Sequence, residues 1–223
     1  MLSKDQKMRK LIKIGAFILA CSVFANCSNT RYLKPGQNLY NGAEVKINPD
    51  SSSKIDDAKQ VKSELESKTR PRPNKSILGL KPKLFIYNLA GEPKKPKGIR
   101  NWLRNKVGEP PVLMSEVKLK YNNDVLKSYL ISQGYLQAEV TGDTVIKRRR
   151  GKAIYTANTG IRYKINQVTF PPDTGDLTHN INVNKSKTLL KTGDFYDLDT
   201  YKNERIRIDN DLKESGYFYF SPE

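Results

Sequence analysis

The chain has 223 residues, and its 40 Lys and Arg outnumber its 23 Asp and Glu to give a formal net charge of +17. It contains one histidine and two cysteines, both of which precede residue 28. A metal site built from several Cys and His ligands is therefore excluded. The sequence also lacks a glycine-rich phosphate loop of the usual spacing. We predict a protein that is not an enzyme and that holds no metal.

Residues 1–26 are typical of a bacterial lipoprotein signal peptide. Basic residues up to Lys13 precede an uncharged run from Ile14 to Ala25, which is too short to cross a bilayer but suits a signal peptide. Cys27 is the predicted lipid site, and Cys21 is the alternative because the small residue before it fits the processing signal better. A cleaved signal without lipid and an uncleaved anchor also remain open. The expected cofactor is only the covalent lipid on Cys27, with residues 27–38 as a tether.

The next part of the sequence predicts an α+β unit of two helices on a three-stranded sheet. Alternating apolar residues predict the strands, and apolar residues three or four apart predict the helices. Pro71 must end the first helix. The predicted elements are a strand at 39–48, helices at 54–69 and 115–133, and strands at 136–141 and 153–158, with an irregular, Pro-rich basic insertion at 70–112.

Two helix ends in the sequence are related by a fixed offset of 82 residues. Leu130, Gly134 and Tyr135 recur as Leu212, Gly216 and Tyr217. A glycine just past the last helical turn can adopt the left-handed backbone of a C-cap, and a repeat at a fixed offset indicates duplicated units. Coincidence between two ordinary helix ends is the alternative. The inward residues that we expect on these helices are Val117, Tyr121, Leu126 and Leu130 in the first copy, and Tyr201, Ile208 and Leu212 in the second.

The remaining sequence predicts a second unit of the same kind. Ile161, Tyr163 and Ile165 alternate with polar residues as in a strand. Two consecutive polar residues, Asn166 and Gln167, interrupt the alternation and indicate a bulge. Helices are expected at 177–190 and 198–215, followed by a strand over 217–220. We therefore predict one domain at 39–159 and a second at 160–223. The second is expected to be incomplete at its C-terminus, because the sequence contains no segment for its third strand.

Basic residues concentrate in three segments, at 68–75, 94–106 and 147–152. Behind a secretory signal, anionic lipid head groups or an acidic partner are better candidates than nucleic acid. Solvated loops are the alternative. Trp102 lies within the second of these segments and is a candidate contact with a partner or a membrane surface.

Several stretches resemble the lipidated, BamA/TamA-like outer-membrane proteins of Bacteroidetes, the TamL-like group. They are Cys27–Ile47, Arg72–Leu80 (Arg-Pro-Asn-Lys-Ser-Ile-Leu-Gly-Leu), Leu84–Leu89 and Gly108–Leu113 (Gly-Glu-Pro-Pro-Val-Leu), together with the Gly-Tyr helix ends. The resemblance implies tandem POTRA (polypeptide-transport-associated) units that face the periplasm from the outer membrane. In that family the units precede a β-barrel that helps to insert other proteins. The barrel segments are absent from this sequence, so we expect a fragment or a truncated product.

The resemblance also implies how such a unit would act. An exposed sheet edge offers backbone hydrogen-bonding groups to an extended client, and the second strand is the open edge of POTRA domains. The implied edge residues are Leu136, Gln137, Ala138, Glu139, Val140, Thr141, Tyr217, Phe218, Tyr219 and Phe220. Alternatively, these residues are core and the 70–112 insertion blocks the edge. Expected partners are outer-membrane lipid, unfolded outer-membrane proteins and an inner-membrane or periplasmic protein, with no nucleic acid. The alternative function is a membrane-anchored lipoprotein unrelated to assembly.

Overall fold

The computed structural model describes residues 29–49 and 58–221. The predicted signal peptide, both cysteines and the beginning of the helix expected at 54–69 lie outside the described residues. None of the helices in the described ranges has the length and apolar character needed to cross a membrane.

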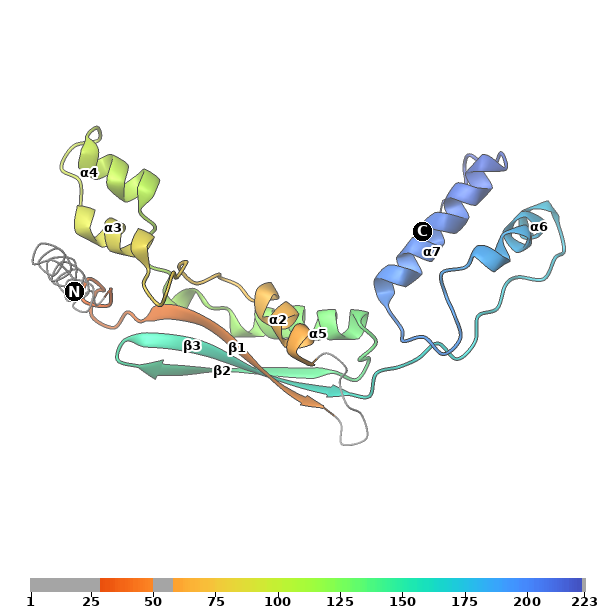
Figure 1. The fold of residues 1–223 in the computed structure, drawn as a ribbon, viewed down its shortest axis with the longest axis horizontal. Helices are drawn as coiled ribbons and strands as arrows, with labels where there is room; N and C mark the ends of the chain where they lie inside the picture. Colours follow the sequence, from red (N-terminus) through yellow and green to blue (C-terminus); the bar gives the residue numbers. More distant parts are fainter. Residues whose placement is uncertain (1–28, 50–57, 222–223) are drawn as a thin grey trace, which may run out of the picture. The chain divides into compact units, whose positions relative to one another are not determined.

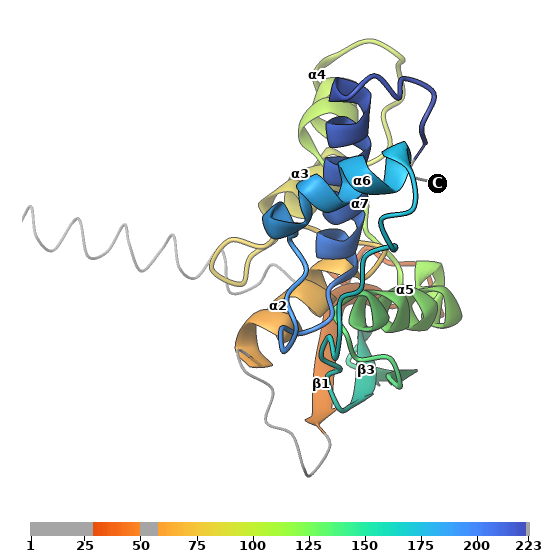
Figure 2. The ribbon, with the colours of Figure 1, turned by 90° about the vertical axis from the view of Figure 1, so that its right-hand side faces the viewer.

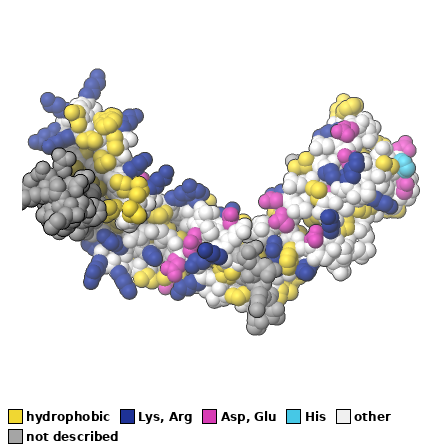
Figure 3. All heavy atoms as spheres, in the orientation of Figure 1, with side chains coloured by type: hydrophobic (Ala, Val, Ile, Leu, Met, Phe, Trp, Pro, Cys, Tyr) yellow, Lys and Arg dark blue, Asp and Glu magenta, His cyan; other side chains and the backbone are white. Residues whose placement is uncertain are grey.

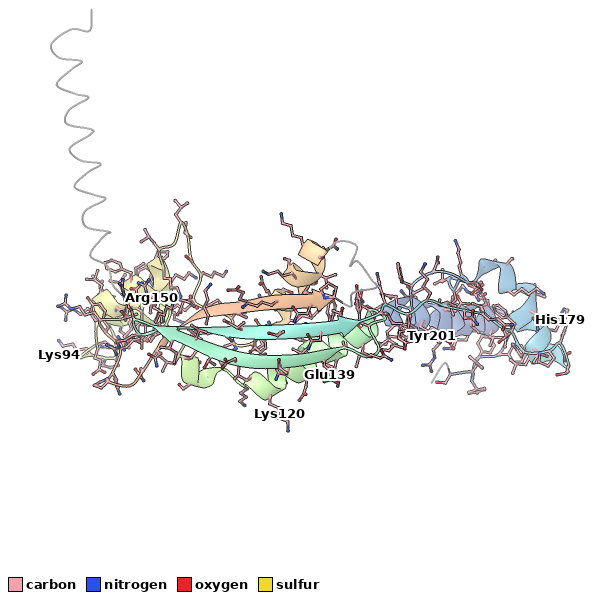
Figure 4. The ribbon with its side chains drawn as sticks, turned by 90° about the horizontal axis from the view of Figure 1, so that it is seen from below. Lys94, Lys120, Glu139, Arg150, His179 and Tyr201 are labelled. Atoms are coloured by element: carbon pink, nitrogen blue, oxygen red, sulfur yellow. The ribbon has the colours of Figure 1, made fainter. Side chains whose placement is uncertain are left out.

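Three strands form one mixed sheet, with β1 (Leu39–Pro49), β2 (Glu139–Lys147) and β3 (Arg150–Gly160) in the order β1-β3-β2. The Leu39 amide donates to the Arg149 carbonyl oxygen at 2.9 Å, and the Asn48 side chain donates to that of Asn158 at 3.1 Å. Both pairs are 110 residues apart, so β1 and β3 run parallel. A tight turn makes β2 and β3 antiparallel (Figures 1 and 4). The predicted three-stranded mixed sheet is confirmed.

Helices α2 (Ala58–Lys68) and α5 (Leu119–Ser132) lie side by side on one face of the sheet (Figures 1 and 2). Every second residue of β3 lies on the helical side of the sheet, and this row is buried. It consists of Gly151, Ala153, Tyr155, Ala157 and Thr159. Because most of these side chains are small, the helices can approach closely, and Leu65, Leu126 and Leu130 fill the space above them. The predicted α+β layer is confirmed.

The predicted helix at 115–133 differs from α5 in its beginning and in its buried face. A short 3-10 helix, η2 (Met114–Glu116), precedes α5. Leu126 and Leu130 are buried as expected, but Tyr121 is 55% exposed and its neighbour Asn122 is fully buried. The inward position of Tyr121 was therefore wrong. The buried amide of Asn122 satisfies backbone groups of Arg70, which the apolar pattern could not indicate.

The described chain divides into two units by its internal contacts. Unit 1 contains residues 29–42, 71–117 and 144–152, and unit 2 contains residues 43–49, 58–70, 118–143 and 153–221. Both units take residues from the predicted domain at 39–159. The predicted boundary at residue 160 stays a prediction.

Unit 1 shows that the 70–112 insertion is not irregular, which corrects the prediction. It contains α3 (Pro82–Ala90), α4 (Ile99–Trp102) and the π-helical turn η1 (Leu103–Val107). Proline opens α3 because its ring already has the helical φ and the first turn needs no amide donor. The Arg104 guanidinium holds these helices together, donating to the Gly91 carbonyl oxygen at 3.0 Å and to the Tyr87 hydroxyl at 2.8 Å.

The described part of the predicted tether is bound to unit 1. Leu33 is buried in a small core with Leu39 and Leu84. The Arg149 guanidinium donates to the carbonyl oxygens of Leu33 and Lys34 at 2.8 and 2.6 Å. Residues 29–38 are thus part of the fold of this unit.

The second half of unit 2 contains α6 (Asp176–Val183), the 3-10 turn η3 (Lys185–Lys187) and α7 (Leu198–Glu214). Both predicted helices are present, although the first ends earlier and Tyr201 is exposed rather than inward. The strand predicted at 161–165 does not form, because this segment pairs only at an isolated bridge between Lys164 and Phe195. Its other backbone bonds join it to two loops. The Ile165 amide donates to the Asp194 carbonyl oxygen at 2.8 Å, and the Tyr163 amide donates to the Gly134 carbonyl oxygen at 2.9 Å.

Candidate functional site

The two helix ends related by 82 residues have the same backbone geometry. The amides of Tyr135 and Tyr217 donate to the carbonyl oxygens of Leu130 and Leu212, each at 3.0 Å. The glycines before them have φ values of 93° and 99°, in the left-handed region. This five-residue return bond with a left-handed glycine is a Schellman C-cap. The predicted repeat of the helix end is confirmed, because both copies have the same C-cap hydrogen bond and the same glycine conformation.

The residues after each glycine form a turn before any strand begins. The amide of Ala138 donates to the Tyr135 carbonyl oxygen, and the amide of Phe220 donates to that of Tyr217, both at 3.0 Å. β2 consequently begins at Glu139, so Leu136, Gln137 and Ala138 precede the strand. Over the described residues, Tyr217–Phe220 is a turn and not the predicted strand. The predicted client-binding role of these residues stays a prediction.

β2 is an outer strand of the sheet, and its second half carries the most exposed apolar side chains on it. Val145 and Ile146 are 40% and 49% exposed. A two-residue hairpin turn at Arg148–Arg149 pairs Lys147 with Arg150, so the alternation of an antiparallel ladder directs the Ile146 amide away from β3. We did not predict Val145 or Ile146 as edge residues, although two β-branched residues before a polar turn are a strand signal.

The other outer strand, β1, is occupied by contacts from its own chain. The Tyr40 amide donates to the Val112 carbonyl oxygen at 2.8 Å, and Leu39 and Leu113 form a bridge. Farther along, the Val45 amide donates to the Glu66 carboxylate at 3.1 Å. The end of the insertion therefore pairs with the edge of β1, which leaves β2 as the better candidate for strand addition.

Charge is divided unequally between the two units. Residues 29–42, 71–117 and 144–152 contain 17 Lys and Arg against 3 Asp and Glu. Residues 43–70, 118–143 and 153–223 contain 18 against 19. Around α3 and α4, Figure 3 shows Lys and Arg side chains beside exposed hydrophobic ones. Unit 1 thus holds the excess positive charge of residues 29–223.

The described residues show no arrangement typical of catalysis. No group of three or more His, Cys, Asp and Glu among them could hold a metal ion. His179 contacts the Asp173 carboxylate at 3.0 Å, and both side chains are exposed on or beside α6 (Figure 4). An exposed pair of this kind lacks the buried, shaped surroundings of an active site.

No family model matches the chain, and no curated protein matches it. One solved structure that does match is the crystal structure of Haemophilus influenzae BamA POTRA3-5, with 11% sequence identity and a TM-score of 0.28. The match covers 80% of this chain and 88% of that chain. A likeness this weak carries no argument about fold or function.

Proposed function

We propose that this chain is a periplasmic, lipid-anchored module of an outer-membrane protein assembly factor, and that it binds extended clients by strand addition to β2. The observation that carries the proposal is the strand order, which places β2 at the outside of the sheet with Val145 and Ile146 exposed. An outer strand presents backbone donors and acceptors that an extended chain can pair with irrespective of its sequence. The resemblance of the sequence to TamL-like proteins supports the choice of client.

The contrast between the two outer strands also supports β2. The edge of β1 receives the Val112 carbonyl oxygen and the Glu66 carboxylate, so a client would have to displace both. Val145 and Ile146 point to opposite faces of β2, so an added strand could contact apolar surface on either side. Lipid attachment at Cys27, with Cys21 as the alternative, remains part of the proposal, as does the periplasmic location.

The test uses the full chain in detergent and a synthetic extended peptide with alternating apolar and polar residues. Hydrogen exchange is followed with and without the peptide. We expect slower exchange at 144–147 and little change in β1. Ile146→Pro should abolish this protection because proline has no amide hydrogen, and an edge strand tolerates it.

Ile146→Thr is the matched control, since it keeps the amide and loses only apolar surface. We expect it to weaken peptide binding by only several-fold, on the order of the loss of one or two buried methylenes. Equal binding by the Pro variant and the native chain would rule out strand addition at this edge. Protection that maps instead to the 70–112 insertion would favour a lipoprotein whose binding role is unrelated to assembly.

A further inference from the structure

Unit 1 contains a cavity of about 640 Å³ with a basic lining. Four cationic side chains line it, and no carboxylate is among the described residues that form the lining. The four are Lys75, Lys81, Arg150 and Lys152. A second cavity of about 560 Å³ shares Arg150 and Lys152 and adds Lys147 and Arg148. Several cations that share one hollow repel one another, and an anion bound there would offset that repulsion.

Lys81 is affected both by burial in this cavity and by the charge of Arg150. Its ammonium donates to the Asn41 side-chain oxygen at 2.9 Å, so its position in the cavity is fixed. Burial, and after it the charge of Arg150, lower the pKa of Lys81, with Glu109 acting in the opposite direction. Asn41 and Asn74 add polar groups to the same wall. These groups suit the oxygens of a phosphate, which accept several hydrogen bonds at once.

An exposed apolar turn borders the cavity. Ile77 and Leu80 exchange backbone hydrogen bonds of 2.8 and 3.0 Å, and Leu78 and Gly79 form the turn between them. Leu78 is 98% exposed, and Ile77 is also well exposed. Gly79 and Leu80 line the cavity, so the apolar turn and the cationic groups belong to one surface.

Leu78 occupies a backbone conformation that does not suit it. Its φ is 50° and that of Gly79 is 79°, as in a type I′ turn, for which Asn-Gly is the favoured pair. Among the described non-glycine residues, only Leu78, Arg148 and Arg149 have positive φ. Leu78 lies in the Ile77–Leu80 turn, and the two arginines form the hairpin turn between β2 and β3, both in unit 1. Strained residues cluster at functional sites. A fully exposed leucine in this conformation contributes little to folding, which favours a role in binding.

We infer that this surface of unit 1 docks on an anionic bilayer, with a lipid phosphate in the cavity lined by Lys81 and Arg150 and the Ile77–Leu80 turn in the head-group region. The combination of cations with protruding apolar side chains is the one that binds peripheral proteins to anionic membranes. The positive charge of unit 1 as a whole favours the same surface. The inference rests on the proposed membrane-side location but not on strand addition.

The test measures contact between unit 1 and the bilayer, not the fraction of chain bound to vesicles. The N-terminus is expected to anchor the chain in any bilayer, so the bound fraction would not report on unit 1. The full chain is reconstituted in vesicles of phosphatidylcholine alone, or of phosphatidylcholine with a minority of phosphatidylglycerol. Hydrogen exchange is followed over 75–83 and 145–152. We expect slower exchange in both segments in the anionic vesicles only, and the difference should shrink at high salt because ions screen exposed charges.

Two variants separate the charged and apolar contributions. Arg150→Gln combined with Lys152→Gln should lower the docking equilibrium constant by about fivefold for each cation removed. Leu78→Asn should also reduce docking, while its melting temperature stays equal or rises because it creates an Asn-Gly turn. The matched control is Lys94→Gln combined with Lys95→Gln, which removes the same charge from unit 1 outside both cavities and should have a smaller effect.

The results that would overturn the inference are specific. Equal exchange in the two kinds of vesicle would exclude docking on an anionic bilayer. Equal losses for the cavity pair and the Lys94/Lys95 pair would show diffuse charge attraction without a phosphate site. Protection by inorganic phosphate alone, at a level that also abolishes the effect of phosphatidylglycerol, would show that the ligand is a free anion and not a lipid.

Discussion

The side-chain amide of Asn74 donates to the carbonyl oxygen of Pro110 at 2.8 Å and thereby joins the two ends of the basic insertion. The same side chain accepts the Val112 amide at 3.0 Å and is only 2% exposed. Asn74 lies in one of the stretches that carry the family resemblance, and Pro110 lies in another. These stretches, which are far apart in the sequence, meet at this amide.

Asn74→Ala is expected to destabilise the fold by about 2 kcal/mol, because it removes two hydrogen bonds of a buried side chain, to the Pro110 carbonyl oxygen and from the Val112 amide. Denaturant unfolding of the full chain measures this. Asn101→Ala is the control, since the Asn101 side chain donates to the Pro96 carbonyl oxygen at 2.7 Å on an exposed surface. It should change stability by less than about 0.5 kcal/mol. Similar losses for both variants would contradict the joining role of Asn74.

Asn122 and Tyr155 are expected to be energetically coupled. The Asn122 amide nitrogen donates to the Tyr155 hydroxyl at 2.7 Å and to the Arg70 carbonyl oxygen at 2.7 Å, in a fully buried position. Tyr155→Phe should cost about 1 kcal/mol and Asn122→Ala about 3 kcal/mol, since the latter also leaves the Arg70 backbone without its partner. A double-mutant cycle in denaturant should give a double variant more stable than the sum of the single losses. Strict additivity would show that this hydrogen bond contributes nothing.

The repeated helix end provides a matched pair of glycines. A Cβ atom on Gly134 would lie 2.6 Å from the Tyr196 carbonyl oxygen. Around Gly216, none of the atoms of the described residues beyond its chain neighbours and its own helix comes within 4 Å of such a Cβ. Both glycines have φ near the same left-handed value. Gly216→Ala should therefore cost only the conformational strain, about 1 kcal/mol. Gly134→Ala should cost about 2 kcal/mol more because the backbone must move. Equal melting temperatures for the two variants would contradict the close contact.

Glu204 is expected to make stability depend on pH in the acid range. Burial raises the pKa of Glu204, but hydrogen bonds from Arg207 at 2.7 Å and from the Leu189 amide at 2.8 Å outweigh it, so the pKa lies below its ordinary value of 4.5. A lowered pKa means that the unfolded chain binds the proton first. The contribution of Glu204 is therefore complete above pH 4.5 and is lost as the pH falls through the lowered value.

Glu204→Gln tests this dependence by denaturant unfolding over a series of pH values. The variant should lose about 2 kcal/mol at neutral pH, where it lacks charge-assisted bonds. The gap between variant and native chain should narrow as the pH falls below 4.5. The exposed Glu214→Gln serves as control and should show no such narrowing. A gap that stays constant with pH would mean that the charge of Glu204 does not contribute.

The elements that could be predicted are those that bury a single face, because burial of one face gives the sequence a regular apolar pattern. β1 and β3 alternate regularly because one face packs on helices, and α5 and α7 each carry a repeated apolar spacing. The segment 161–165 has the same alternation and yet is not a strand, because it pairs with residues 193–196 around one bridge and not with a strand of the sheet. Periodicity indicates which side is buried, but it does not supply a partner.

The basic cavity could not be predicted as a site, because its cations come from different parts of the sequence. Lys75 and Lys81 lie in the insertion, while Arg150 and Lys152 lie at the beginning of β3. Each group has the composition of a solvated loop when taken alone. These segments are brought together by the pairing of Leu39 with the turn before β3 and with Leu113, contacts between residues far apart in the sequence.

Because residues 29–38 are attached to unit 1, only a short length of chain would separate unit 1 from a lipid on Cys27. Asn29 already lines the basic cavity, and Leu33 lies in the core of the unit. An acyl chain on Cys27 would be two residues away, and two extended residues span at most about 7 Å. Such a short connection would hold unit 1 at the bilayer at an effective concentration of at least millimolar order. A weak head-group contact of unit 1 would then form far more often than it would without the anchor. The anchor would thus favour one orientation of unit 1 at the bilayer as well as its location there.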